Sequence, residues 1–271
     1  MIEDEFSKFI EKSLKKKSRQ PFDLLKSFIC SLYWIFHPEK ESAFVLPQNK
    51  CYRVFGKGVN FFIPSLNLAQ AHLRHVKKPF DIDEPYERFY EVKEGDVVLD
   101  VGADIGKTAV RFGRKAGSNG LVVSIEPSPK RILALEANIK SKLPFQNVLV
   151  INKGISNYKK AEKIGNTLDN EELTEKNDAK VIDFVTLDDI VSEIQIDSIN
   201  FLKIDIEGFE LKALKGGKET LKITQNVSIA THPLIREGIT EKVKNYIRKR
   251  GFKTRINNKK KEAEEIVYGW K

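Results

Sequence analysis

The sequence predicts an α/β fold in which a mostly parallel sheet is covered by helices on both faces. Beyond residue 91, apolar runs alternate with segments whose apolar residues recur at helical spacing, which is the pattern of strand–helix–strand units. The apolar runs are continuous, as is typical of strands buried on both sides. Acidic residues and glycines follow several of these runs, so we expect the chemistry at one edge of the sheet.

The predicted strands are short apolar runs bounded by turn residues. In the α/β region they are Val97–Val101, Leu121–Ile125, Val148–Asn152, Ile199–Ile204 and Asn226–Thr231, with Phe252–Ile256 and Glu265–Tyr268 closing the sheet. The predicted helices are Pro85–Tyr90, Thr108–Ala116, Pro129–Lys140, Glu207–Leu214 and Thr240–Arg250. The polar segment Asn157–Lys180 predicts a surface loop or lid, and Val181–Val185 after it predicts an extra strand.

The chain divides into an N-terminal extension, residues 1–83, and an α/β domain, residues 84–271. The extension begins with a basic arm, and the apolar residues of 22–36 recur at helical spacing, which predicts an amphipathic helix. This helix either packs on the α/β domain or lies on a membrane surface, where Tyr33, Trp34 and flanking lysines would suit the interface. A small β segment follows, with strands predicted at Ala43–Leu46, Cys51–Phe55 and Val59–Ile63.

The composition is that of a globular protein with a basic surface. Hydrophobic residues make up 41% of the chain and the formal net charge is +9, which fits nucleic acid, an anionic membrane, an acidic substrate or a solvated surface. The acidic start shows no apolar leader and no apolar run reaches the roughly 20 residues of a membrane span, so we expect a cytoplasmic protein, peripheral at the membrane if residues 22–36 bind there.

Cys30 and Cys51 predict reduced thiols. No His/Cys cluster has metal-ligand spacing, so no metal site is predicted.

The turn after the first strand of the α/β region is rich in glycine. Residues 97–108 read VVLDVGADIGKT, so a strand ends near Asp100 and passes through Gly102, Ala103 and Gly106 into a helix. Glycines let the backbone turn sharply and let a ligand approach closely. The spacing D-x-G-x-x-x-G differs from the G-x-G-x-x-G of dinucleotide sites, which argues against an NAD-linked dehydrogenase. It favours a nucleoside that carries a sulfonium and an amino acid.

The next two strands end in residues that suit the rest of such a nucleoside. Glu126 follows the second strand together with Pro127 and Ser128, and its carboxylate can accept hydrogen bonds from both ribose hydroxyls. The structural alternative is a helix-capping loop with Ser128 as N-cap before Pro129, and both readings can hold together. Gly154 follows the third strand, where an adenine ring would lie, although alone it resembles an ordinary turn glycine.

The fourth and fifth strands end in the candidate catalytic residues Asp205, Glu207 and His232. Two carboxylates at the carboxyl edge of a buried strand are costly unless they are used. They could face a cationic sulfonium, accept a proton from the acceptor or hold a metal ion, while Glu207 could simply favour the start of a helix. His232 would project into the same cleft. We expect Asp205 or His232 to act as the base, with Glu207 in support.

Taken together, these segments resemble the FkbM-like family of methyltransferases that depend on S-adenosylmethionine (SAM). The resemblance spans roughly residues 84–235, and the motifs that carry it are VVLDVGADIGKT, SIEPSP, KGIS, VTLDDI and FLKIDIEGFELKALKGG. It implies a Rossmann-like sheet of seven strands, with SAM as cofactor. It also implies transfer of a methyl group to a hydroxyl on a small molecule, a sugar or a glycan.

The resemblance also implies a place for each matched residue: Asp100, Gly102, Ala103 and Gly106 at the methionine end, Glu126 at the ribose and Asp205 near the reacting centre. Two positions depart from the family pattern. Asp104 stands where the family usually has Asn, and Ala230 stands where it usually has a Glu two residues before the His. If that Glu matters in relatives, acceptor binding or the catalytic base differs here.

Two other functions stay open from the sequence alone. The basic stretches Lys242–Arg255 and Lys259–Lys261 would suit an RNA methyltransferase, although no RNA-binding module is recognisable. The second alternative is a SAM-binding or structural protein that does not catalyse a reaction and that binds a membrane through residues 22–36. Neither the acceptor nor the oligomeric state is predicted.

Overall fold

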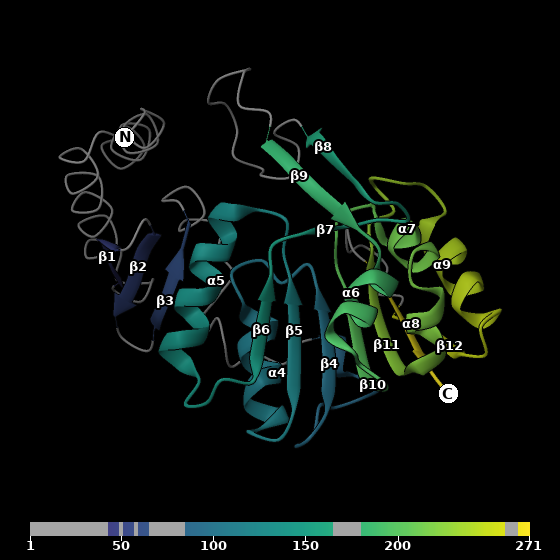
Figure 1. The fold of residues 1–271 in the computed structure, drawn as a ribbon, viewed down its shortest axis with the longest axis horizontal. Coiled ribbons are helices and arrows are strands. Elements are labelled where there is room, and N and C mark those ends of the chain that lie inside the picture. The colour runs from purple at the N-terminus through teal and green to yellow at the C-terminus, as the bar shows by residue number, and fades with distance from the viewer. Residues whose placement is uncertain (1–42, 49–50, 57–58, 65–84, 165–179, 258–264) are drawn as a thin grey trace, which may run out of the picture.

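The structure is a computed structural model that describes residues 43–48, 51–56, 59–64, 85–164, 180–257 and 265–271. The central sheet has seven strands in the spatial order β12 (Lys253–Asn257), β13 (Glu265–Trp270), β11 (Thr224–Thr231), β10 (Ile199–Ile204), β4 (Val97–Val101), β5 (Leu121–Ile125) and β6 (Val148–Ile151). Neighbouring strands from β11 to β6 are parallel, whereas β13 runs against both of its neighbours. The predicted Rossmann-like, mostly parallel sheet is confirmed (Figure 1).

Helices cover both faces of this sheet because alternate residues of each strand point to opposite sides. Leu99 and Val101 belong to one core cluster with side chains from α6 (Leu187–Ile194), α7 (Glu210–Lys215), α8 (Lys218–Ile223) and α9 (Ile239–Arg248). Val98 belongs to another cluster, which includes Phe112 of α4 (Lys107–Ala116). Helix α5 (Pro129–Lys142) follows β5 and contacts β6.

A second sheet of three strands lies beyond the carboxyl ends of β4, β5 and β6 (Figure 1). Its order is β7 (Gly154–Ile155), β9 (Lys180–Val185) and β8 (Lys160–Ile164), with β8 antiparallel to β9. The predicted extra strand is therefore confirmed, but the expectation of a loop throughout Asn157–Lys180 is wrong at its beginning. The reason is that three of the five residues of Lys160–Ile164 are charged, which is typical of a loop but is also tolerated on an edge strand.

The β segment of the N-terminal extension packs on α5. The three predicted strands are present as β1 (Ala43–Gln48), β2 (Cys51–Gly56) and β3 (Val59–Ile63), and they form an antiparallel sheet. Asn138 of α5 accepts a 2.7 Å hydrogen bond from the Phe62 N–H and donates one of 2.9 Å to the Phe62 carbonyl. Cys51 is a free, buried thiol in this core. The helix expected over 22–36 and the thiol of Cys30 lie outside the described residues, and the boundary at residue 84 stays a prediction.

Several helix predictions need correction. Only Pro85–Glu87 of the segment Pro85–Tyr90 is helical, as the 3-10 turn η1, and α7 begins at Glu210 rather than Glu207. The short helices α6 and α8 were not predicted. Within the described ranges, none of the helices combines the length and the apolar character that crossing a membrane would require.

Candidate functional site

The site lies where the turns after β4 and β10 meet, at the point where the strand order reverses. Open α/β sheets bind their ligands at such a switch point. Gly102 has a φ of +85°, and a Cβ added there would lie 1.8 Å from the carbonyl oxygen of Asp205. The Asp205 N–H in turn donates to the carbonyl of Val101 at 2.9 Å. Glycine is therefore required at position 102, because the two turns touch through their backbones.

Asp100, near the end of β4, helps to hold the turn at Gly102 in place. Its carboxylate is fully buried, accepts a 2.7 Å hydrogen bond from the Thr108 hydroxyl and lies 3.1 Å from the Nζ of Lys203. Lys203 also donates a 2.7 Å hydrogen bond to the carbonyl of Gly102. The lysine was not singled out in the sequence, although a cation inside the apolar strand FLKI is a visible signal. The pair holds the turn in place rather than lining the pocket.

Ala103 and Gly106 pack the turn against helix α5. Ala103 is buried in a small core cluster with Leu135. Gly106 has a φ of +93° at the N-terminus of α4, and a Cβ there would lie 2.6 Å from a methyl carbon of Leu135. Close helix–strand packing therefore explains both small residues, and neither lines the pocket.

Glu126, at the end of β5, is almost completely buried. Its two carboxylate oxygens accept 3.0 Å hydrogen bonds from the backbone N–H groups of Asp104 and Ser128. Burial raises the pKa of Glu126 to about 7, against the opposing charge of Arg131. Each oxygen of a carboxylate can accept a second hydrogen bond, so capacity for ligand hydroxyls remains.

Two neighbours of Glu126 correct or extend the sequence analysis. Ser128 stands at the N-cap position of α5, but its hydroxyl makes no capping bond and has no hydrogen-bond partner among the described residues. Asp104 has a φ of +49°, and its carboxylate lies 3.2 Å from the Arg131 guanidinium. The Arg131 guanidinium therefore compensates the negative charge of Asp104.

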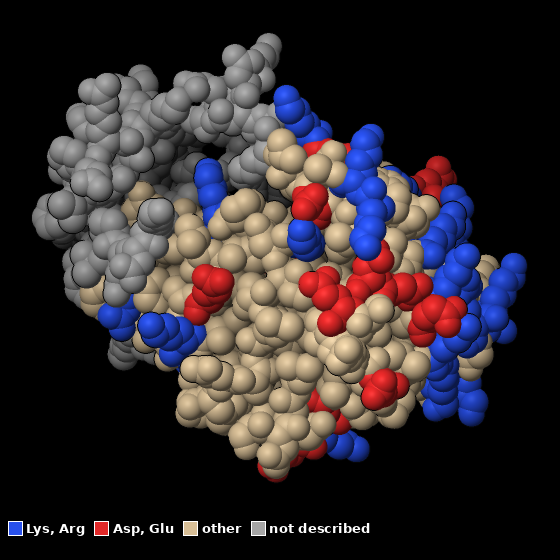
Figure 2. All heavy atoms as spheres, viewed as in Figure 1, with Lys and Arg blue, Asp and Glu red and all other residues tan. Residues whose placement is uncertain are grey.

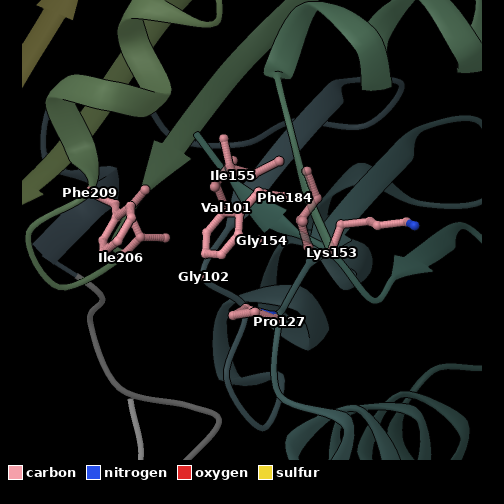
Figure 3. Close-up of a pocket in the computed structure, with 10 residues that line it drawn as sticks. Val101, Gly102, Pro127, Lys153, Gly154, Ile155, Phe184, Ile206 and Phe209 are labelled. Carbon is pink, nitrogen blue, oxygen red and sulfur yellow. The ribbon is translucent and has the colours of Figure 1, made fainter. Parts of the chain in front are cut away.

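An apolar pocket opens at the carboxyl end of β5 (Figure 3), where the residues before and after Glu126 line it. Its walls are Val101, Gly102, Ile125, Pro127, Lys153, Gly154, Ile155, Phe184, Ile206 and Phe209. Gly154 lies in β7 rather than in a simple turn, and a Cβ there would lie 2.6 Å from the Phe184 ring. Phe184 stacks on Phe209 with ring centroids 5.7 Å apart. The predicted residues Gly102, Pro127 and Gly154 line this pocket, whereas its two aromatic walls were missed.

A cluster of ionisable groups lies next to the pocket. His232 places Nδ1 3.0 Å from Oε1 of Glu210 and Nε2 3.5 Å from Oδ1 of Asp205. The Tyr86 hydroxyl donates a 2.9 Å hydrogen bond to the other oxygen of Asp205. Burial alone would lower the pKa of His232, but the hydrogen bond to Glu210 and the charges of Asp205, Glu210 and Glu207 raise it to about 9. The imidazole is therefore a cation at neutral pH.

The structure brings Asp205 and His232 together, as expected, and leaves Glu207 at the exposed rim. Glu207 has a φ of +50° and acts on His232 through its charge. Glu210 and Tyr86 were not predicted. The acidic run IEGFE contained the signal for Glu210, whereas nothing in the sequence connects Tyr86 to this site. Ala230 is buried in the core.

No group of three or more His, Cys, Asp and Glu side chains among the described residues is arranged to hold a metal ion. The fold and site define a Rossmann-like α/β protein with an apolar pocket beside a cluster of ionisable groups. The family model described as Methyltransferase FkbM domain matches residues 100–254, more than half of the chain. The chain belongs to this family, and the resemblance predicted from the motifs is confirmed.

Individual relatives are distant. The chain is 26% identical over 146 residues to the hexuronic acid methyltransferase AglP of Haloferax volcanii, a match that covers 52% of this chain and 58% of that relative. The methyltransferase FkbM of Methylobacillus flagellatus is 20% identical, with a TM-score of 0.48 over 67% of this chain and 45% of that one. Aeropyrum pernix fibrillarin with bound SAM is 13% identical, with a TM-score of 0.43 over 83% and 97%.

Proposed function

We propose that this protein transfers a methyl group from SAM to a hydroxyl oxygen of a sugar or another small hydroxylated acceptor. The observation that carries the proposal is the contact between a nucleoside-type pocket and an acid–base cluster. Ile206 lines the pocket, and the residue before it, Asp205, carries a carboxylate of the cluster. A sugar acceptor is favoured because the curated relative is named for methylation of a hexuronic acid.

The described residues fit the proposed cofactor. The pocket walls include the rings of Phe184 and Phe209 and suit an adenine ring, since aromatic and apolar walls favour a stacked heterocycle. Glu126 retains acceptor capacity for the ribose hydroxyls, and the buried hydroxyl of Ser128 lacks a partner in the described part of the chain. When bound, SAM supplies an electrophilic methyl carbon on its sulfonium.

Asp205 is the group that we propose to accept the proton of the acceptor hydroxyl. At neutral pH, His232 is already protonated and cannot take a second proton. Asp205 is held from two sides, by the Tyr86 hydroxyl and the His232 ring, so its carboxylate has a fixed orientation. A carboxylate held in one orientation would favour the in-line approach of an acceptor, and positioning of this kind supplies much of the rate in group transfer.

Binding and transfer are tested separately. Calorimetric titration with S-adenosylhomocysteine should show micromolar binding by the wild type. Glu126→Ala should remove this binding. Glu136→Ala, which changes an exposed glutamate on α5, is the control and should leave the binding unchanged. Transfer is measured with methyl-labelled SAM on glucuronic acid glycosides, neutral glycosides and RNA, for the wild type and Asp205→Asn. Label on a glycoside that requires Asp205 supports the proposal, and binding without transfer to any acceptor would favour the non-catalytic alternative.

The RNA arm of this experiment has a structural motive. Lys242, Arg248 and Lys249 of the α9 region are exposed, and Lys and Arg side chains gather on the side of the molecule where α9 lies (Figure 2). Such a surface binds phosphates with a steep dependence on salt. If RNA becomes methylated, and if this methylation is lost when the three residues are changed to Gln, RNA would replace the sugar as the proposed acceptor.

A further inference from the structure

Glu210 is a buried carboxylate that joins two parts of the site. Its side chain is 0% exposed. Oxygen Oε1 accepts a 2.8 Å hydrogen bond from the Gly208 N–H and lies 3.0 Å from Nδ1 of His232, while Oε2 is buried without a hydrogen-bond partner among the described residues. A buried carboxylate is strongly destabilising unless a cation and hydrogen bonds compensate it. His232 is the cation in contact with it.

The backbone contact of Glu210 fixes the turn that follows Asp205. Glu207 and Gly208 both have left-handed conformations, with φ of +50° and +98°. Such a turn is unfavourable for Glu207 and needs support from its surroundings. The hydrogen bond from Gly208 to Glu210 provides it. One carboxylate therefore ties the turn after β10 to the loop after β11.

We propose that Glu210 is a positioning residue, which holds the His232 ring through its Nδ1–H so that Nε2 faces Asp205. This inference rests on the function proposed above and adds a residue to its mechanism. Glu210 does not line the pocket, and we expect it to act through His232. The arrangement follows the logic of other sites in which a buried carboxylate fixes the tautomer and the orientation of a histidine.

Three carboxylates from neighbouring segments act on His232. Asp205 approaches from the end of β10, Glu207 from the following turn and Glu210 from α7. The 3-10 turn η1 adds the neutral phenol of Tyr86 through Asp205. The loop of His232 itself contributes Arg236, whose Nε would lie 3.7 Å from a Cβ on Gly208. Of the three carboxylates, Glu210 alone makes both a short contact to the ring and a backbone bond.

The test is Glu210→Gln, which keeps an oxygen that can accept the Gly208 N–H and removes the negative charge. The ring resonances of His232 are followed by NMR from pH 6 to 11 and assigned by their absence in His232→Gln. We expect the pKa of His232 to fall by about one unit or more in Glu210→Gln. Glu193→Gln, on the exposed face of α6, is the matched control and should leave that pKa unchanged.

The kinetic readout is the pH profile of kcat. In the wild type, kcat should fall at high pH as His232 loses its proton, and in Glu210→Gln this limb should move to lower pH. At pH 7 we expect kcat to fall roughly tenfold to a hundredfold, less than the loss typical of a missing acid–base group. The affinity for S-adenosylhomocysteine should stay within about twofold, because Glu210 does not line the pocket.

An unchanged His232 pKa together with an unchanged high-pH limb in a folded Glu210→Gln protein would overturn the proposal. If that variant does not fold, the wild type decides through its nitrogen chemical shifts above pH 10. The neutral Nδ1–H tautomer supports the proposal and the Nε2–H tautomer contradicts it. NMR needs no methyl transfer, so a failure of the proposed function, seen as absent cofactor binding or absent transfer, is distinguishable from a failure of this inference.

Discussion

The phenol of Tyr86 donates a 2.9 Å hydrogen bond to Oδ2 of Asp205, and the two residues are 119 positions apart. The ring is held in place through its own backbone, because the Tyr86 carbonyl accepts a 2.6 Å hydrogen bond from the Ser228 hydroxyl. The Pro85 carbonyl similarly accepts one of 2.7 Å from Tyr268. The segment that precedes the first strand of the central sheet therefore contributes a side chain to the candidate site.

The first prediction concerns this phenol. Tyr86→Phe should lower kcat by roughly tenfold to a hundredfold, since a hydrogen bond to a charged group contributes about 1.5–3 kcal/mol. Tyr90→Phe is the matched control, because the Tyr90 hydroxyl donates a bond of the same length, 2.9 Å, to Asp96. Both variants should lose comparable stability in thermal unfolding, but only Tyr86→Phe should lose transfer. Equal kcat values in the two variants would remove Tyr86 from the mechanism.

The second prediction is a pH dependence of cofactor binding. In the free protein, the pKa of Glu126 is raised to about 7, so the carboxyl is protonated in mild acid. Ribose hydroxyls donate to the ionised form, and the affinity for S-adenosylhomocysteine should therefore rise as pH increases from 6 to 8. Calorimetry on Glu126→Gln should show weaker binding with a flat profile. A wild-type affinity that does not vary over this range would contradict the contact.

The same carboxyl predicts a change in stability without ligand. Its pKa lies above the ordinary value of 4.5, so the folded state holds this proton more tightly than the unfolded state does. The free energy of unfolding should therefore decrease as pH rises from about 4.5 to about 7, and this component should stay constant above that range. Denaturant titrations of the wild type and Glu126→Gln at several pH values isolate it. If Glu126 titrated normally, the difference between the two curves should not vary between pH 4.5 and 7.

The third prediction uses two glycines with similar positive φ angles. Gly95 and Gly102 have φ of +83° and +85°, but a Cβ on Gly95 meets nothing within 4 Å, whereas one on Gly102 meets the Asp205 carbonyl at 1.8 Å. Gly95→Ala should lose about 1 kcal/mol of stability from its conformation alone. Gly102→Ala should lose several kcal/mol more and also cofactor binding. Similar losses in both variants would mean that the contact between the turns is readily relaxed.

The fourth prediction concerns the buried pair beneath the turn. Lys203→Met leaves the carboxylate of Asp100 buried without its cation, which should lower the free energy of unfolding by about 3–5 kcal/mol. Lys203→Met combined with Asp100→Asn should recover part of that loss. Lys222→Met breaks an exposed pair with Glu219 and should change stability by less than about 1 kcal/mol. Urea unfolding of the four proteins compares them, and a Lys203→Met protein as stable as Lys222→Met would refute the argument.

The sheet was predictable from sequence because its strands are continuous apolar runs. The predicted and observed bounds coincide at Val97–Val101, Leu121–Ile125 and Ile199–Ile204. Helix α6 was missed although its capping box, formed by Thr186 and Asp189, is visible in the motif VTLDDI. Strand β8 was missed because three of its five residues are charged, so it lacks the apolar signal on which strand prediction depends.

The site was predictable wherever a residue directly follows a parallel strand. Glu126, Asp205 and His232 all lie at the carboxyl edge for that reason. The role of Glu210 could not be predicted, because it depends on where the left-handed turn ends and α7 begins. Tyr86 and Phe184 reach the site from separate segments, through tertiary packing that no local pattern encodes.

The contact of Gly102 with the Asp205 carbonyl couples the turn after β4 directly to the turn after β10. No side chain lies between them to absorb a displacement, so a ligand that shifts the turn after β4 also shifts the carboxylate after β10. We therefore expect occupancy of one half to alter the other, and kinetics in which one substrate binds first and prepares the position of its partner. The two substrate specificities of such an enzyme would have to change together over evolution, because one stretch of backbone serves both.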